Sequence, residues 1–340
     1  MTPSLHDVRT QAAGAVLRRV AGPDPSAARD RIHLTPGPRW FDPDSPIARV
    51  HGDASMFVGG VRALLLQSLH PRAMAAVAAH SGYRGDPWGR LQRTAGFIAT
   101  TTFGAADHAE QTIAVVKAVH ARIRGTTPRG ETYEASEPHL LRWVHLAEID
   151  SFLMAHQRYG RQPLDPAGCD EYVAQSARIG AALGATDLPL TLAGVHEALA
   201  AYRPELDGTP EARAAARFLI YTPPLPLAVR PAYGAIVAAG VAMMPAWSRR
   251  PLGLPYLPWV ESTAVRAGGQ VMTRAIRWAL DSAPPGVPAD VVADVAGADA
   301  AEDLLLSASV AAAPGVAPPA PSAPEVVASE LWAPVPDERG

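Results

Sequence analysis

The stretch DPWGRLQRTAGFIATTTFGAADHAEQTIAVVKAVHARIRG, residues 86–125, decides the fold that this sequence predicts. It predicts two helices joined by a tight turn. Asp86 is a good N-cap with Pro87 at the first helical position, and Gly104 is a typical end for the first helix. A helix end followed closely by the start of another helix is typical of two antiparallel helices that pack side by side.

The second helix of this pair begins, on the same reasoning, near Asp107. Asp107 followed by Glu110 resembles a capping box, and Gly125 predicts the end of the helix. We therefore expect the two helices to run back along each other from a turn at Gly104.

One face of each predicted helix carries residues that could meet a ligand. On the first helix, positions i, i+3, i+4 and i+7 are Arg90, Arg93, Thr94 and Phe97. On the second, an apolar stripe contains Ile113, Val116, His120 and Ile123. With a rise of about 1.5 Å per residue, Arg93 lies roughly 16 Å and His120 roughly 20 Å from the turn. Two arginines, a threonine and a histidine are therefore expected at a similar height between the helices.

The rest of the chain also shows helical periodicity, with few stretches of two-residue alternation. The expected helices lie near 53–69, 72–80, 136–159, 170–183, 192–202, 210–221, 232–243 and 260–282. We predict an all-α protein with a single multi-helix domain over residues 1–283. A Pro/Ala-rich tail at 284–340 is predicted to be largely disordered, with a short helix near 300–306 as an option.

Composition excludes several classes of function. Thirty basic and 33 acidic residues give a net charge of −3, so the chain carries no nucleic-acid footprint. The single cysteine, Cys169, excludes an internal disulfide and a cysteine-cluster metal site. No secretory signal or transmembrane stretch is evident, which makes a cytoplasmic protein the expectation.

The familiar catalytic motifs are absent from the sequence. It contains no P-loop, no G-x-G-x-x-G after a strand, no G-x-S-x-G and no H-E-x-x-H. A di-iron bundle needs two Glu-x-x-His helices, whereas this chain has one reversed His145-x-x-Glu148. His145 and Glu148 are therefore interpreted as a buried hydrogen-bonded pair, and His70 before Pro71 as a residue that closes a turn.

His120 can be interpreted in two ways. A histidine on an apolar stripe is most often a satisfied core residue, and Arg90 and Arg93 then form an ordinary solvated face. Buried arginines, however, need an anionic partner. A ligand with anionic groups and a metal, such as haem, would pair with the arginines and bind the imidazole. His145 is the second candidate for the axial ligand.

Several segments in order resemble the MpaB-type oxygenases, a family that includes the latex-clearing rubber oxygenases and fungal enzymes that cleave a prenyl chain oxidatively. The segments are LLLQSLHPRAMAAVAAHSGYRGDPWGRLQRTAGFIATTTFG (64–104), VHARIRG (119–125), YEASEPHLLRWVHLAEIDSFL (133–153) and PAWSRRPLGLPYLPW (245–259). The resemblance covers about residues 10–280 and is most specific over 64–153.

This resemblance implies an all-helical, globin-like domain that holds one b-type haem. It implies that His120 is the proximal iron ligand and that Arg90, Arg93 and Thr94 lie on the distal side. Rubber oxygenases have a lysine at the middle position of that distal face, whereas this chain has Arg93. A guanidinium never deprotonates and is a poor iron ligand, so the sixth position is expected to be open or occupied by water.

The leading hypothesis is a haem-b oxygenase or peroxidase-like oxidoreductase that acts on an apolar small molecule with O2 or peroxide. Oxidative cleavage of a carbon–carbon double bond is one reaction of this class. Arg90, Arg93 and Thr94 would be catalytic, and Phe97, Leu65 and Val116 would line the pocket. The alternatives are a haem-carrying sensor without turnover and a purely structural helical scaffold. The substrate and the oligomeric state stay open.

Overall fold

The computed structural model describes residues 9–10, 13–14, 16–17, 20–22, 24–80, 86–222, 225, 227 and 230–281. The sequence-based expectation of a disordered tail at 284–340, with a helix near 300–306, falls outside these residues. So does residue 283, the predicted end of the helical domain.

The described chain is mostly helical, as predicted, and forms one domain. In chain order its elements are α2 (Pro25–His33), α3 (Pro46–His51), α4 (Met56–Gln67), α5 (Pro71–His80), α6 (Pro87–Phe103), α7 (Ala106–His120), β1 (Arg124–Thr126), β2 (Thr132–Glu134), α8 (Pro138–Tyr159), α9 (Pro166–Leu183), α10 (Leu192–Ala201), the 3₁₀ turn η1 (Arg203–Glu205), α11 (Pro210–Tyr221), α12 (Arg230–Ala242), α13 (Ala246–Leu252), α14 (Pro258–Val260), the π turn η3 (Glu261–Val265) and α15 (Arg266–Leu280).

Proline, aspartate, threonine and glycine set many of the helix boundaries. The side chains of Asp86, Asp165 and Thr209 each accept a hydrogen bond from the backbone N–H three residues later, and a proline follows each of them. Gly184 ends α9 in the left-handed conformation with φ of 110°, which glycine adopts without a Cβ clash. These caps explain why the starts of α6 and α11 can be predicted closely.

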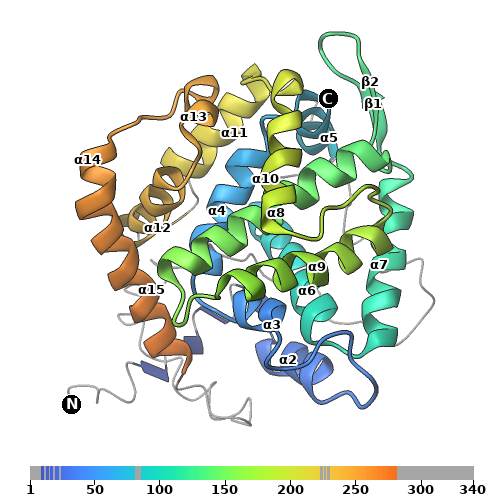
Figure 1. Ribbon diagram of the computed structural model, residues 1–340, viewed down its shortest axis with the longest axis vertical. Helices are drawn as coiled ribbons and strands as arrows, with labels where there is room; N and C mark the ends of the chain where they lie inside the picture. Colours follow the sequence, from blue (N-terminus) through green and yellow to red (C-terminus); the bar gives the residue numbers. More distant parts are fainter. Residues whose placement is uncertain are drawn as a thin grey trace, which may run out of the picture.

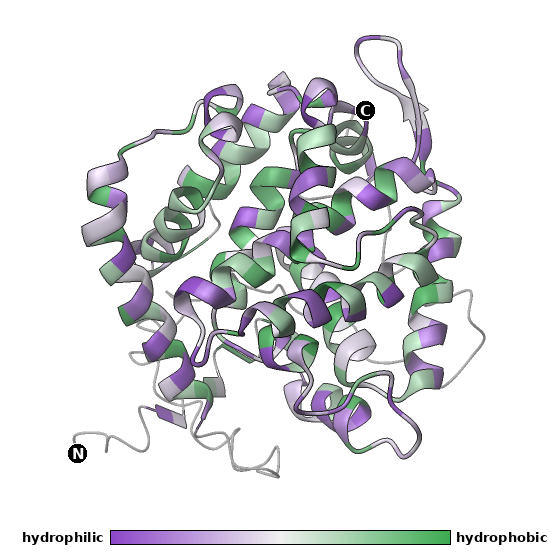
Figure 2. Ribbon diagram, viewed as in Figure 1, coloured by the Kyte–Doolittle hydropathy of each residue, from purple (hydrophilic) through white to green (hydrophobic). Residues whose placement is uncertain are grey.

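Helices α4 and α8 form the centre of the molecule (Figure 1). Helix α4 packs along α8 on one side and against α12 on another. Trp143 and Leu146 of α8 and Leu65 and Leu66 of α4 are almost completely buried. Hydrophobic residues gather in this central region, whereas the edge helices α7 and α15 carry many hydrophilic residues (Figure 2). The helix expected near 53–69 is confirmed as α4, with bounds Met56–Gln67.

Helix α4 nevertheless carries one buried charge. Arg62 is 4% exposed, and its Nη2 lies 2.7 Å from Oδ2 of Asp150 on α8, which is 3% exposed. Arg62 also donates to the Ser151 hydroxyl at 2.7 Å and to the Met243 carbonyl at 2.9 Å. This ion pair therefore fixes the contact between the two central helices and the end of α12.

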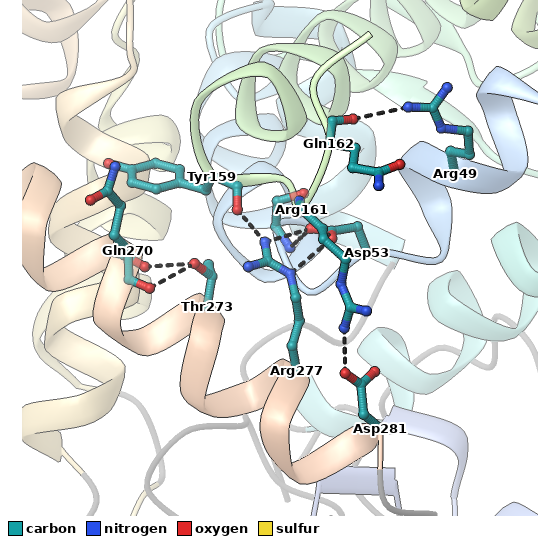
Figure 3. Close-up of polar contacts among 11 residues, drawn as sticks. Arg49, Asp53, Tyr159, Arg161, Gln162, Gln270, Thr273, Arg277 and Asp281 are labelled. Carbon is teal, nitrogen blue, oxygen red and sulfur yellow. Dashed lines mark hydrogen bonds and ion pairs between the residues drawn. The ribbon is translucent and has the colours of Figure 1, made fainter.

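The last helix, α15, is tied to the body by arginine–carboxylate pairs (Figure 3). Arg277 donates from Nε and Nη2 to the two oxygens of Asp53, each at 2.9 Å, and also bonds the carbonyl of Tyr159. Arg161 pairs with Asp281 at the end of α15. The bidentate pair joins α15 to the loop before α4 and to the end of α8.

The structure corrects the predicted second helix of the 86–125 stretch. Helix α7 begins at Ala106 after Ala105, so Asp107 lies in its first turn and forms no capping box. The helix ends at His120, and Gly125 lies inside strand β1, opposite Tyr133 of β2. The start is instead fixed from outside, because Ala106 N–H donates to the Pro38 carbonyl at 2.8 Å.

The β1–β2 hairpin was not predicted from the sequence. It projects beyond the helices in Figure 1. Its two three-residue strands pair antiparallel, and Tyr133 is buried against Val119, Ile123 and Leu140. Among the described residues, no helix has the length and the apolar character needed to cross a membrane.

Candidate functional site

A single cavity of about 980 Å³ collects the residues that the sequence singles out. Its walls come from α2, α4, α5, α6, α7, α8 and α9, on the side of the molecule away from α15 (Figure 1). The predicted site residues in this wall are Arg90, Arg93, Thr94, Phe97, Val116 and His120. The structure therefore brings all six together around one space, and their individual roles stay predictions.

Helix α6 supplies the cationic and polar part of this wall. Arg90, Arg93 and Phe97 are partly buried, and Thr94 is exposed. Arg93 Nη1 lies 3.2 Å from Oδ2 of Asp86, the residue that caps the same helix. The Thr94 hydroxyl donates to the Arg90 carbonyl at 3.0 Å, a bond within the helix. Both guanidinium groups are always charged, so this face places two cationic side chains in the cavity wall.

Another part of the wall comes from α7. Val116 and His120 both line the cavity, and His120 is the last residue of the helix. Burial lowers the pKa of His120 to about 4. Its imidazole is therefore neutral at pH 7, which is the form that binds a metal ion.

Helix α8 adds a second histidine and a carboxyl group. His145 and Glu148 lie one turn apart in the cavity wall. Burial lowers the pKa of His145 to about 4 and raises the pKa of Glu148 to about 7, although the charge of Arg90 opposes the second shift. Two neutral imidazoles and a carboxyl that titrates near neutral pH therefore face the same space.

The predicted hydrogen bond between His145 and Glu148 is not formed through His145 Nε2. This atom is buried without a hydrogen-bond partner within the described part of the chain. The imidazole ring instead packs on Gly180 of α9, where a Cβ would lie 2.9 Å from its Nδ1 and Cε1. Glycine at position 180 thus makes room for the ring at the edge of the cavity.

The prediction that Leu65 lines the pocket is wrong. Leu65 is 1% exposed in the core between α4 and α8, and its neighbour Leu64 faces the cavity. One residue along a helix is a rotation of about 100°, so the error places the side chain on the adjacent face. The sequence also did not indicate that Glu148 lines the cavity with a raised pKa. The pKa is raised by burial, and the spacing of residues along the chain does not show burial.

The rest of the lining is largely apolar. It includes Val77, Leu140, Val144, Ile179 and Leu183. A few polar groups in a mostly apolar concave wall are typical of a site for a small molecule or a cofactor, and such sites span about 300–1,000 Å³. At position 96, also in the wall, a Cβ on the glycine would meet no atom within 4 Å, so the space is open there.

Comparison with known protein families gives one match that covers most of the chain. Residues 48–278 match the family described as ER-bound oxygenase mpaB/B'/Rubber oxygenase, catalytic domain. The match includes every cavity residue contributed by α4 to α9. No curated protein and no solved structure gives a match.

Proposed function

The chain belongs to the MpaB/rubber oxygenase catalytic-domain family, and from this premise we propose that it is a haem-b-dependent oxygenase or peroxidase-like enzyme for an apolar small molecule. Membership in the family implies an oxygenase. The observation that carries the finer proposal is the convergence of His120, Arg90 and Arg93 on one largely apolar cavity. Each of these residues supplies one of the contacts that a haem requires.

The cavity fits such a cofactor in size and in donor set. Its volume of about 980 Å³ is at the upper end of the range for bound small molecules. Neutral imidazole is an iron ligand, and arginine pairs with carboxylates through two parallel hydrogen bonds. When bound, haem would supply the iron redox chemistry that activates O2 or peroxide.

We assign His120 as the residue that holds the iron. Burial keeps its ring neutral at physiological pH, and a neutral imidazole is the form that binds iron. It is the last residue of α7, and it lines the same cavity as Arg90 and Arg93 of α6. His145 of α8 is the competing candidate for the iron ligand, because its Nε2 is buried without a hydrogen-bond partner among the described residues. The variant His145→Ala is therefore the control for His120→Ala.

Arg90, Arg93 and Thr94 bind and orient from the other side. The two guanidinium groups pair with anionic groups of the cofactor or stabilise negative charge that develops in the cavity. Arg93 cannot lose its proton, so it would act as a fixed charge and not as an iron ligand. Its guanidinium is held in the cavity wall by the salt bridge to Asp86 at 3.2 Å.

Glu148 is placed to hold or move a proton at its carboxyl oxygens. A pKa of about 7 leaves the protonated and ionised forms at similar populations near neutral pH, which suits a general acid or base. The apolar side chains of Phe97, Val116 and Val144 exclude water and favour a substrate without charge. The proposed substrate class is therefore an apolar molecule with an oxidisable double bond or ring.

A turnover assay tests the catalytic part of this proposal. The reduced protein is mixed with O2 and a library of alkenes and aromatic compounds, and O2 uptake and oxygenated products are measured. We expect product from at least one member, with Glu148→Gln lowering the rate while haem content is unchanged. Haem and O2 binding without product from any member would instead identify a haem-carrying sensor.

A further inference from the structure

A second group of metal-ligating side chains lies outside the residues that line the cavity. His70 precedes α5, His139 lies in the first turn of α8, and Glu205 ends η1. One ligand atom from each of the three lies within 4.8 Å of the other two. We infer that His70, His139 and Glu205 bind a divalent transition-metal ion of the zinc class. This inference does not depend on haem or on the proposed reaction.

The distances suit a small tetrahedral ion. Glu205 Oε2 lies 2.8 Å from His139 Nε2 and 3.5 Å from His70 Nε2. With metal–ligand bonds of about 2.0–2.1 Å, ligand atoms in a tetrahedral zinc site are about 3.3 Å apart. The two distances to Glu205 lie on either side of this value, and the two imidazoles have ligand atoms within 4.8 Å of each other. A small movement of the half-exposed Glu205 carboxylate would bring the three ligand atoms around one ion.

His70 is a buried imidazole with unused nitrogens. Its side chain is 3% exposed, and neither ring nitrogen makes a hydrogen bond to any residue in the described ranges. Burying a polar group without a partner is unfavourable, so this ring needs a ligand or a bound water.

Tyr202 fixes the orientation of His139. The Tyr202 hydroxyl donates to the His139 carbonyl at 2.9 Å, so its oxygen accepts from His139 Nδ1 at 3.3 Å. In the neutral ring Nε2 then carries a lone pair, and it faces Oε2 of Glu205 at 2.8 Å. Two lone pairs repel at this distance unless a proton or a metal ion lies between them. Metal-binding histidines are commonly held by such a contact at the other nitrogen.

The surroundings favour a site that is open to solvent on one side. The side chains of His139 and Glu205 are each 40% exposed, which gives an ion a path to His70. The His70 ring is packed between Trp143 and Tyr202, with centroid distances of 6.2 and 6.3 Å. Three protein ligands leave a fourth position for water. The ion would join the α4–α5 junction, the start of α8 and the turn after α10.

The test is zinc titration of the untagged full-length protein after removal of metals with a chelator. Isothermal titration calorimetry and metal analysis after dialysis give the affinity and the stoichiometry. We expect one zinc per chain. Loss of a ligand should weaken binding at least tenfold in Glu205→Gln and in His139→Gln, because even the loss of an outer contact costs about 10–100-fold. Both substitutions are at half-exposed positions, and circular dichroism checks the fold.

His33→Gln and Glu110→Gln are the matched controls, since both residues are exposed and lie on other helices. They should bind zinc like the unmodified protein. Absence of zinc binding, or equal binding by all variants, would overturn the inference and leave a protonated His139 paired with Glu205. Neither result bears on haem, which is read separately from the visible spectrum.

Discussion

The carboxyl group of Glu148 makes the stability of this protein depend on pH in a defined direction. Burial in the cavity wall raises its pKa from 4.5 to about 7, against the effect of Arg90. The folded chain therefore holds this proton more tightly than the unfolded chain. The resulting stabilisation is fully present below pH 4.5 and is lost as the pH rises through 7.

The pKa shift of Glu148 also gives the size of this change in unfolding free energy. Each pKa unit is worth about 1.4 kcal/mol, so the shift from 4.5 to about 7 corresponds to roughly 3 kcal/mol of unfolding free energy. Glu148→Gln has nearly the same shape and carries no charge at any pH. Relative to the unmodified protein, the variant should thus gain roughly 3 kcal/mol between pH 4.5 and pH 8.

Chemical denaturation at a series of pH values measures this difference. Every other titrating group is common to both proteins, so the difference between their unfolding free energies isolates Glu148. Glu110→Gln on the exposed side of α7 is the control and should give a flat difference. If the curves for Glu148→Gln and the unmodified protein run parallel across this range, the carboxyl does not titrate in a buried cavity wall and the reasoning fails.

Three further substitutions test other parts of the structure. Asp150→Asn should cost about 3–5 kcal/mol in urea unfolding, because it leaves the buried charge of Arg62 without its counter-ion. Gly208→Ala should cost about 3 kcal/mol, since a Cβ there would lie 1.9 Å from the carbonyl oxygen of Pro251. Arg93→Lys should shift the Soret band of the haem-loaded protein at high pH, because an amine can lose its proton and bind iron whereas a guanidinium cannot.

Each of these predictions has a control or a contrary result. Glu137→Gln removes a partly exposed ion pair with Arg72 and should cost less than about 1 kcal/mol. Gly234→Ala places its Cβ in open space within α12 and should be neutral or stabilising by up to about 1 kcal/mol. Equal losses in a variant and its control would refute the packing argument. An unchanged spectrum for Arg93→Lys would remove residue 93 from the neighbourhood of the iron.

The helical architecture could be predicted because its signals are local. Pro138 and Gly160 mark the ends of α8, and Pro210 and Tyr221 are the observed ends of α11. The convergence of α6 and α7 residues on one cavity also follows from the helical period, since positions three and four apart share a face. Where such caps were replaced by contacts from elsewhere, as at the start of α7 beside Pro38, the prediction was wrong.

Features that depend on distant contacts were not predictable. The β1–β2 strands have three residues each and are too short to show an alternating pattern in the sequence. Their packing on the helices depends on Tyr133, whose burial the sequence does not indicate. The Arg62–Asp150 pair places a charge inside a helix that reads as apolar. The group formed by His70, His139 and Glu205 joins residues up to 135 positions apart, and no motif spacing indicates it.

The central claim is that His120 holds a haem in this cavity, and the visible spectrum of the purified protein tests it most directly. The unmodified protein should show a Soret band, either as isolated or after titration with haem. His120→Ala should remove the band, and His145→Ala should retain it. A protein that stays colourless after haem titration, or a band that survives in His120→Ala and disappears in His145→Ala, would contradict this account.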